Sequence, residues 1–259
     1  MKRSDEVAKL LTEYAEGRRD FSGARLDHII LHDAKLRSVD LTGAHLEQAD
    51  LSSVDLTGSR LDGAQLHGAR LEGTQLIGAS LERADLSGAT LTNAELTGAS
   101  LRAANLSRAD LQFADLAGAD LTDCDLRHAF ALRVNLSGAT LTGARLDGAN
   151  LEQAKLNQAV APKQDLHRAH MPQADLQDAD LAETNLSGAG LSEDKLQHAN
   201  LRGANLSNAD LRLSNLRESN LRDADLSGSD EEHTQLGGAD THGANFEGAR
   251  QEHIQPPQP

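Results

Sequence analysis

A leucine recurs at every fifth residue through most of the chain. Between residues 79 and 100, the stretch ASLERADLSGATLTNAELTGAS places leucine at four successive positions of this register. The register runs from Phe21 to Phe246 without an inserted or deleted residue, and leucine occupies 39 of its 46 positions. The seven exceptions are Phe21, Ala131, Ala161, Met171, Glu231, Thr241 and Phe246. A pattern of this length predicts one regular repeat architecture.

A period of five fits neither a helix nor a long strand. At about 100° per residue, each repeat would rotate by roughly 140°, and the leucines of a helix would spread around every face. Side chains of a strand alternate, so an odd spacing would send successive leucines to opposite faces. The chain is therefore predicted to turn once in every repeat.

Each repeat can be divided into inward and outward positions around the leucine, which we call position i. Residue i−2 is usually alanine, as at Ala84, and strand alternation puts i−2 and i on the same, inward side. Residue i−1, such as Asp85, then points outward. Residues i+1 and i+2, such as Ser87 and Gly88, form the corner, where glycine supplies the positive φ of a tight turn. Four corners close a square coil, and coils stack about 4.8 Å apart.

The motif A(D/N)LSG, as in residues 84–88 and 224–228, resembles the pentapeptide-repeat family. The resemblance implies a right-handed quadrilateral β-helix, which for this register means about eleven coils and a rod of about 55 Å. We therefore expect an all-β solenoid in three parts. These are an N-terminal capping α-helix in residues 1–19, the pentapeptide-repeat β-helix in residues 20–250 and a disordered Pro/Gln tail in residues 251–259.

The capping helix is predicted from an amphipathic pattern in residues 4–14. Ser4 has the character of an N-cap, acidic residues follow in the first turn, and Gly17 would end the helix. Its apolar face is predicted to contain Val7, Leu10, Leu11 and Tyr14. Such a helix would cover the apolar side chains and unpaired strand edges at the end of the first coil.

The repeat weakens toward its other end, where Glu231 and Thr241 occupy centre positions. Burial of an unpaired Glu231 would be costly, so the last coil is predicted either to fray or to form an edge that a partner covers. Gyrase-protecting members of the family dimerise through their C-terminal ends. The resemblance therefore also implies a homodimer through the C-terminal coils.

Three residues in the middle of the chain depart from the pattern. Gln164 and Asp194 stand at inward i−2 positions, where they need hydrogen bonds to the backbone. Pro162 follows Ala161 and cannot donate to a ladder of backbone hydrogen bonds. We therefore predict an irregular coil at residues 158–173, which is open to interpretation as a binding site or as drift in a tolerant scaffold.

Composition agrees with a core made of small, regular pieces, because the chain has no tryptophan and one tyrosine. Its single cysteine, Cys124, stands at an i−2 position, where it is interpreted as a small buried side chain. No apolar stretch suits a signal peptide or a membrane span, and one cysteine fits a reducing compartment, so we expect a cytoplasmic protein. The formal net charge of −15 argues against direct binding to nucleic acid.

Residues twenty apart lie above one another in a square coil, so the outward residues can be sorted into four faces. We call the face around centres 31, 51, 71 and onward to 231 the acidic face, because it has the most negative balance. Its acids are Asp33, Asp50, Glu72, Asp110, Glu152, Glu193, Asp210, Asp230, Glu232 and Glu252, and its arginines are Arg70, Arg133, Arg212 and Arg250. Basic partners are the natural targets of such a face.

The acidic face also carries apolar residues that the repeat does not require. The candidate partner-binding residues are Phe113, Phe130, Leu132, Asp110, Met171 and Pro172. Exposed apolar groups rimmed by charge are typical of protein contacts. The alternative is that Phe130 or Leu132 bends inward through a bulge, to fill the space that Ala131 leaves where a leucine belongs.

No motif for catalysis or for a cofactor is present. The glycines fall at corner positions that the repeat dictates, and no phosphate-binding loop, nucleophile elbow or zinc spacing occurs. His233 and His253 are twenty apart, which is compatible with a divalent ion between coils. We predict no enzyme activity, no cofactor and no metal requirement.

Two functions compete on this evidence. The first is a non-catalytic protein–protein interaction module, an adaptor or regulator that presents a rigid acidic surface. The second is a mimic of duplex DNA that binds a type II topoisomerase, DNA gyrase or topoisomerase IV, as the resemblance to gyrase-protecting members implies. The net charge over about 55 Å gives one charge per ~3.7 Å, against one per ~1.7 Å in duplex DNA. The first function is therefore preferred.

Overall fold

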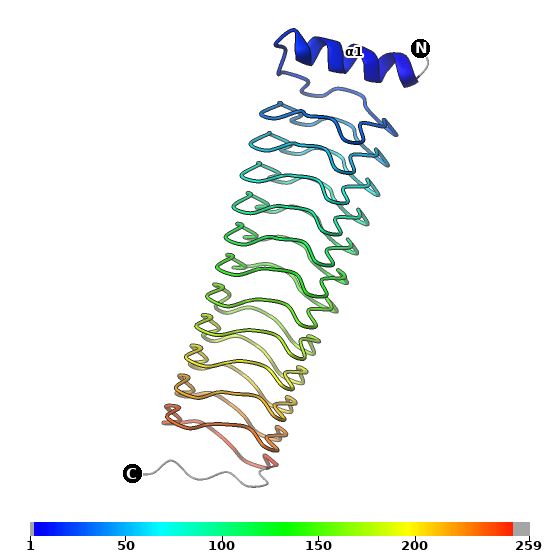
Figure 1. Ribbon diagram of the computed structural model, residues 1–259. Coiled ribbons are helices and arrows are strands. Elements are labelled where there is room, and N and C mark those ends of the chain that lie inside the picture. Colours follow the sequence, from blue (N-terminus) through cyan, green and yellow to red (C-terminus); the bar gives the residue numbers. More distant parts are fainter. Residues whose placement is uncertain (1–2, 251–259) are drawn as a thin grey trace.

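The computed structural model describes residues 3–250, which form a straight rod with one helix across its N-terminal end (Figure 1). Helix α1 spans Arg3–Ala15. The rest of the rod is a right-handed square coil held by parallel bridges between residues twenty apart, from Asp20↔Asp40 to Asp230↔Arg250. This all-β solenoid with a short N-terminal helix confirms the predicted fold class. The predicted division at residues 19 and 250 stays a prediction, and its last segment, 251–259, lies outside the described residues.

Backbone hydrogen bonding explains why the repeat has five residues. Four of the five N–H groups bond to backbone carbonyls, of which two belong to the next coil, one to the preceding coil and one to the same corner. In residues 85–89 these bonds run from Asp85 to Ala64, from Leu86 to Asn105, from Gly88 to Ser107 and from Ala89 to Leu86, with N···O distances of 2.9, 2.8, 3.0 and 3.0 Å. Buried backbone groups are thus satisfied without long strands.

The fifth N–H group, at i+1, bonds to the side chain at i−1. Asp85 Oδ1 accepts the N–H of Ser87 at 3.0 Å, and Asn105 Oδ1 accepts the N–H of Ser107 at 3.1 Å. Asn105 Nδ2 also donates to Asp85 Oδ1 at 3.0 Å, across one coil. The sequence predicted only that i−1 side chains point outward. In the structure the carboxylates among them cap corners, and stacked asparagines separate them from one another.

The core is a column of leucines and alanines that runs the length of the rod. Leucines at centre positions from Leu46 to Leu106 are completely buried, as are most alanines at i−2. Cys124 takes an alanine position and is also completely buried, as predicted. Desolvation raises the pKa of its thiol well above the usual range, so it packs as a small apolar side chain.

Helix α1 covers the first coil with one apolar edge. Leu10 is buried beside the core that includes Phe21, and Val7 and Tyr14 pack against the same core. Tyr14 Oη donates to the carbonyl oxygen of Arg37 at 3.1 Å, which ties the helix to the fourth side of the first coil.

Two details of the predicted helix were wrong. The helix begins at Arg3, so Ser4 lies inside its first turn and is not the N-cap. Leu11 is exposed and does not belong to the buried face. The reason is geometric: Val7, Leu10 and Tyr14 form a narrow stripe, and Leu11 lies about 100° around the helix from Leu10.

The last coil is regular, and the prediction that it frays was wrong. Glu231 is completely buried, its Oε1 accepts a hydrogen bond from Ser229 Oγ at 2.8 Å, and its N–H donates to the carbonyl of Arg250 at 3.0 Å. Hydrogen bonding thus permits a carboxyl group at a leucine position. Leu236 and Phe246, beyond Glu231, are only half-buried.

The predicted irregularity at residues 158–173 is confined to one side of the coil. The bridges Thr140↔Val160 and Asn150↔His170 are in place, whereas Arg145 and Asp165 do not pair among the described residues. Proline is not the cause. Pro162 stands at i+1, where the repeat needs no donor to the ladder. The i−1 residue of the same repeat is Val160, whose side chain accepts no hydrogen bond, so the missing N–H of the proline leaves no partner unpaired.

Gln164 is the cause of this local break. Its side chain is buried at an i−2 position built for alanine, and its Oε1 accepts the N–H of Gly143 at 3.1 Å. In the described ladder, the N–H groups of Leu146 and Gly148 donate to no carbonyl of the next coil. The larger side chain therefore holds the two coils apart along this side.

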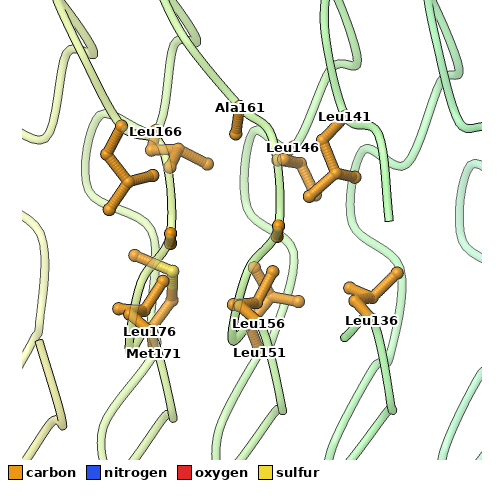
Figure 2. Close-up of a pocket in the computed structure, with 12 residues that line it drawn as sticks. Leu136, Leu141, Leu146, Leu151, Leu156, Ala161, Leu166, Met171 and Leu176 are labelled. Atoms are coloured by element: carbon orange, nitrogen blue, oxygen red, sulfur yellow. The ribbon is translucent and has the colours of Figure 1, made fainter. Parts of the chain in front are cut away.

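An apolar cavity of about 10 Å³ lies in the core beside this break (Figure 2). Ala161 lines it at a position where most coils place a leucine, and Met171 lines it from the opposite side of the coil. Met171 is buried, so the prediction that it contributes to an exposed patch was wrong. A centre position directs the side chain inward whichever apolar residue occupies it.

Candidate protein-binding face

The exposed apolar side chains of the rod gather on the acidic face. The described residues include seven exposed large hydrophobic side chains, and four of them lie on this face. These four are Ile30, Phe113, Phe130 and Leu213, with exposed fractions of 64, 46, 56 and 54%. The two phenylalanines were predicted from the sequence, whereas Ile30 and Leu213 were not. The signal was available, because apolar residues at i−1 or i+2 depart from the repeat.

Phe113, Phe130 and Leu132 come from two neighbouring coils. The bridge Asp110↔Phe130 puts Phe130 one coil beyond Asp110, and the N–H of Phe113 donates to the carbonyl of Leu132 at 3.1 Å. Phe113 and Phe130 are exposed, and Leu132 is half-buried. The stacking of these coils therefore brings the three predicted apolar residues together, and we call Phe113, Phe130 and Leu132 the Phe patch.

The alternative of an inward bulge at Ala131 was wrong. Ala131 keeps its inward position and donates its N–H to the carbonyl of Asn150 at 2.9 Å, as a regular repeat does. Phe130 stays outside, and an apolar cavity of about 10 Å³ remains next to Ala131. The ladder on both sides of Phe130 holds the backbone in register, so the phenylalanine cannot turn inward without breaking it.

A column of hydrogen-bonded polar side chains extends from the Phe patch along the i+2 positions. Arg133 Nε donates to Gln153 Oε1 at 2.5 Å, and Gln153 Nε2 donates to Gln173 Oε1 at 2.9 Å. Gln173 Nε2 then donates to Glu193 Oε2 at 3.0 Å. The guanidinium carbon of Arg133 lies 6.0 Å from the centroid of the Phe113 ring, within reach of a cation–π contact. The column is therefore a fixed polar strip between Phe113 and Leu213.

Leu213 forms a second apolar point beyond this strip. A surface hollow of about 240 Å³ is lined by Ser192, Glu193, Arg212, Leu213, Glu232 and His233. Arg212 donates from Nε and Nη2 to the two carboxylate oxygens of Asp210, at 2.7 Å each. This hydrogen-bonded pair lowers the pKa of Asp210 and fixes the rim of the hollow. The stacked partner predicted for His233, His253, lies outside the described residues.

Several carboxylates of the acidic face are already engaged. Asp110, one of the predicted contact residues, accepts the backbone N–H of Gln112 at 3.1 Å, so it caps its own corner. Asp50, Asp210 and Asp230 each lie within 4.0 Å of an arginine nitrogen. Pro172 is half-buried at an i+1 corner. The face is thus less negative in effect than its composition indicates.

No helix in residues 3–250 is long and apolar enough to cross a membrane.

Comparisons with known proteins agree with the repeat. A family profile described as pentapeptide repeats matches residues 20–52, 49–88, 84–123, 119–158, 165–193 and 195–230. Curated proteins gave no match. Solved structures gave several similar chains.

One similar structure is HetL, a pentapeptide repeat protein involved in heterocyst differentiation regulation from the cyanobacterium Nostoc sp. strain PCC 7120. It is 30% identical, with 94% of this chain and 93% of HetL covered and a TM-score of 0.32. Another is alr5209 from Nostoc PCC 7120, at 33% identity over 54% of this chain and 94% of its own, with a TM-score of 0.30. QnrB1, a plasmid-mediated fluoroquinolone resistance protein, is 19% identical over 84% of this chain and 91% of its own, with a TM-score of 0.46.

Proposed function

The chain belongs to the pentapeptide-repeat family, and we propose that it is a non-catalytic protein-binding module whose partner docks on the acidic face. The observation that carries this proposal is the gathering of Ile30, Phe113, Phe130 and Leu213 on one face of the rod. Large apolar side chains on a monomer surface favour a protein contact when charged residues surround them. The repeat does not require any of the four, because the same outward positions carry polar residues or glycine in most other repeats.

The Phe patch is suited to anchor a partner because its backbone is rigid. Phe113 and Phe130 stand on coils whose N–H groups are held in the ladder, so few conformations are lost on binding. Aromatic anchors in the centre of an interface commonly supply most of the binding energy. Binding to this patch would bury the rings without moving the rod.

The partner is expected to be apolar at its centre and basic at its rim. Glu152 lies beside the polar strip and Glu193 ends it, and neither forms an ion pair with an arginine or lysine of the described residues. Lysine or arginine side chains of a partner could pair with both glutamates. Such pairing would fix the position of the partner along the rod and make its binding depend on salt, while the phenylalanine rings anchor the interaction.

The alternative function, a DNA mimic that binds DNA gyrase or topoisomerase IV, stays a prediction. One observation weighs against this function. Many i−1 carboxylates cap corners or pair with arginine, so the rod presents fewer free negative charges than duplex DNA does. A cytoplasmic location and the absence of enzyme activity also stay predictions.

A matched pair of variants tests the acidic face. The face variant combines Phe113→Gly with Phe130→Asn, which installs the residue types that the repeat normally uses at those positions. The control variant combines Ile77→Ser with Val160→Asn, two exposed apolar residues on other faces that are likewise returned to the repeat. Each protein is immobilised and used to capture partners from cells of the source organism, with quantitative mass spectrometry.

The proposal predicts a protein that the wild type and the control variant capture equally and that the face variant loses by at least tenfold. Equal capture of every protein by all three baits would contradict it. In parallel, supercoiling by purified gyrase is measured with each protein present, with and without a quinolone. Inhibition or drug protection that the face variant retains would favour DNA mimicry through another surface.

A homodimer through the C-terminal coils is a separate proposal. Leu236 and Phe246 are half-buried there, which supports a further apolar contact at this end. Light scattering on the full chain should give twice the monomer mass, and Phe246→Asp should return the monomer. A monomer at every concentration tested would rule the dimer out.

A further inference from the structure

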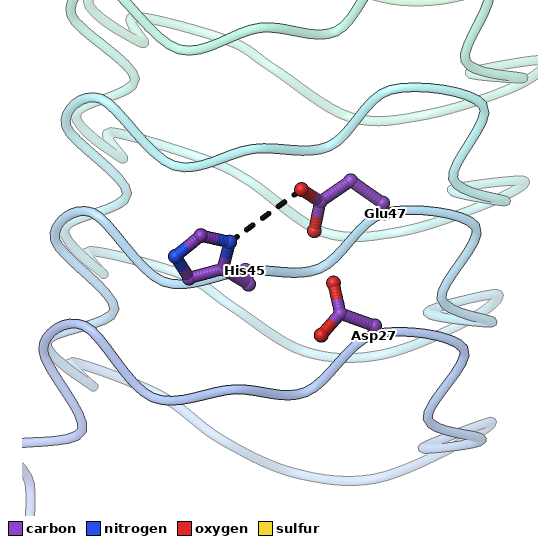
Figure 3. A group of neighbouring side chains, drawn as sticks. All are labelled: Asp27, His45 and Glu47. Carbon is purple, nitrogen blue, oxygen red and sulfur yellow. Dashed lines mark ion pairs between the residues drawn. The ribbon is translucent and has the colours of Figure 1, made fainter.

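A group of three metal-ligating side chains lies at the N-terminal end of the rod, on the side whose centres are Leu26 and Leu46 (Figure 3). Asp27 stands at i+1 of the first of these repeats, and His45 and Glu47 stand at i−1 and i+1 of the repeat one coil later. The period of twenty therefore stacks Asp27 below Glu47. This side does not carry the Phe patch.

The three side chains offer one ligand atom each within a small space. A carboxylate oxygen of Asp27, a carboxylate oxygen of Glu47 and a ring nitrogen of His45 all lie within 4.8 Å of one another. His45 Nδ1 is 3.5 Å from Glu47 Oε1. Asp27 and His45 are exposed, and Glu47 is half-buried, so an ion can enter from solvent.

The two carboxylates lack the compensation that other stacked carboxylates receive. Asp40 has Arg60 within 3.5 Å one coil away, and Asp85 receives a hydrogen bond from Asn105. Among the described residues, neither Asp27 nor Glu47 forms an ion pair with an arginine or lysine. Like charges directly opposite each other on neighbouring strands are destabilising.

One atom of the group points independently to a ligand. Glu47 Oε2 is buried and accepts no hydrogen bond from the described residues. A buried carboxylate oxygen without a donor is rare in folded proteins and calls for an explanation such as an ion.

We propose that Asp27, His45 and Glu47 bind a divalent transition-metal ion between the first two coils. One imidazole and two carboxylates suit Zn²⁺, whereas Mg²⁺ and Ca²⁺ prefer ligand sets made of oxygen alone. Metal–ligand distances of about 2.0 to 2.2 Å require the three ligand atoms to draw slightly closer, which rotations of exposed side chains allow. Water completes the coordination sphere, and the ion joins two coils that backbone hydrogen bonds already align.

The test is isothermal titration of Zn²⁺ into the full chain after dialysis against a chelator. The test variants are His45→Asn and Glu47→Gln, which keep the size of the side chain and remove one ligand each. The control variant is His198→Asn, because His198 and Glu218 form a stacked pair 3.4 Å apart that no third metal-ligating side chain of the described residues joins. Circular dichroism verifies that each variant keeps the β-helix.

The proposal predicts one Zn²⁺ site in the wild type, with at least tenfold weaker binding in both test variants and unchanged binding in His198→Asn. Co²⁺ substituted at the same site should give a visible absorption spectrum that His45→Asn alters, which reports on the imidazole itself. Zn²⁺ binding that is equal in wild type, His45→Asn and Glu47→Gln would overturn the proposal. So would the absence of binding to the wild type.

Discussion

Asp194 Oδ1 accepts a hydrogen bond from the backbone N–H of Ala174 at 2.9 Å, one coil earlier, inside the core of the rod. The second oxygen, Oδ2, is buried and has no hydrogen-bond partner among the described residues. Burial raises the pKa of this carboxyl group to about 9, from a usual value of 3.8. The folded chain therefore holds Asp194 in its protonated form at neutral pH.

This raised pKa predicts a loss of stability as the pH rises. Between about pH 4 and pH 9 the unfolded chain has released the proton and the folded chain has kept it, so the folded state binds more protons. The free energy of unfolding then falls by about 1.4 kcal/mol per pH unit from this group, or about 4 kcal/mol at pH 7. Asp194→Asn should remove this slope. Urea unfolding of both proteins from pH 4 to pH 9 measures it, and parallel profiles would contradict the assignment.

Phe130→Asn should make the protein more stable. Asn150, one coil later, accepts the N–H of Glu152 through its Oδ1 at 3.0 Å, whereas Phe130 offers no acceptor to the N–H of Leu132. The new hydrogen bond should raise the free energy of unfolding by about 0.5 to 1.5 kcal/mol. Phe130→Ala serves as the control, because it removes the ring without adding an acceptor. A gain of the same size in both variants would attribute it to the loss of the exposed ring.

Phe113→Gly should also be stabilising, for a backbone reason. Phe113 has a φ of 61°, in the left-handed region that costs a side chain about 1 to 2 kcal/mol. Glycine removes most of this strain, and thermal unfolding should show a higher midpoint. The reverse change, Gly98→Ala at a φ of 65° with open space around it, should lower the midpoint. Shifts of the same sign in the two variants would exclude backbone strain as the cause.

Gln164→Ala should close the gap in the ladder. Alanine fits the i−2 position, so Gly143, Leu146 and Gly148 can donate to the backbone of the next coil as other repeats do. Amide hydrogen exchange of Leu146 and Gly148 should then slow by at least tenfold. Leu86 and Gly88, which are already in the ladder, are the internal control. Unchanged exchange at the first pair would mean that another residue holds the coils apart.

Phe130 and Gln164 show what the repeat pattern predicts about a side chain and what it does not. Both depart from the repeat, and both were noted for it. The period assigned Phe130 to the outside and Gln164 to the inside correctly, because each side chain must alternate with its neighbours. It could not tell whether Ala131 would draw Phe130 inward, since that depends on whether the ladder yields before the cavity is filled.

For Glu231 and Glu47, the repeat pattern likewise does not predict the surroundings of the charged group. A glutamate at a leucine position predicted a frayed coil, yet Ser229 donates to it inside the core. Glu47 stands at a corner position, which the repeat assigns to the outside, yet one of its oxygens is buried beside Asp27 and His45. Both outcomes depend on the rotamer of a neighbour, which no pattern of apolar positions specifies.

The sequence by itself determined the five-residue repeat, the inward positions, the four faces and the regions where the pattern fails. It could do so because every residue in a square coil meets its neighbours at a constant separation of twenty. The tertiary structure alone decided which carboxylates cap corners, which exposed apolar residues accompany the Phe patch and which side chains meet at Asp27. These features arise from hydrogen bonds and contacts between side chains on different coils, and their geometry is set only when the coils have stacked.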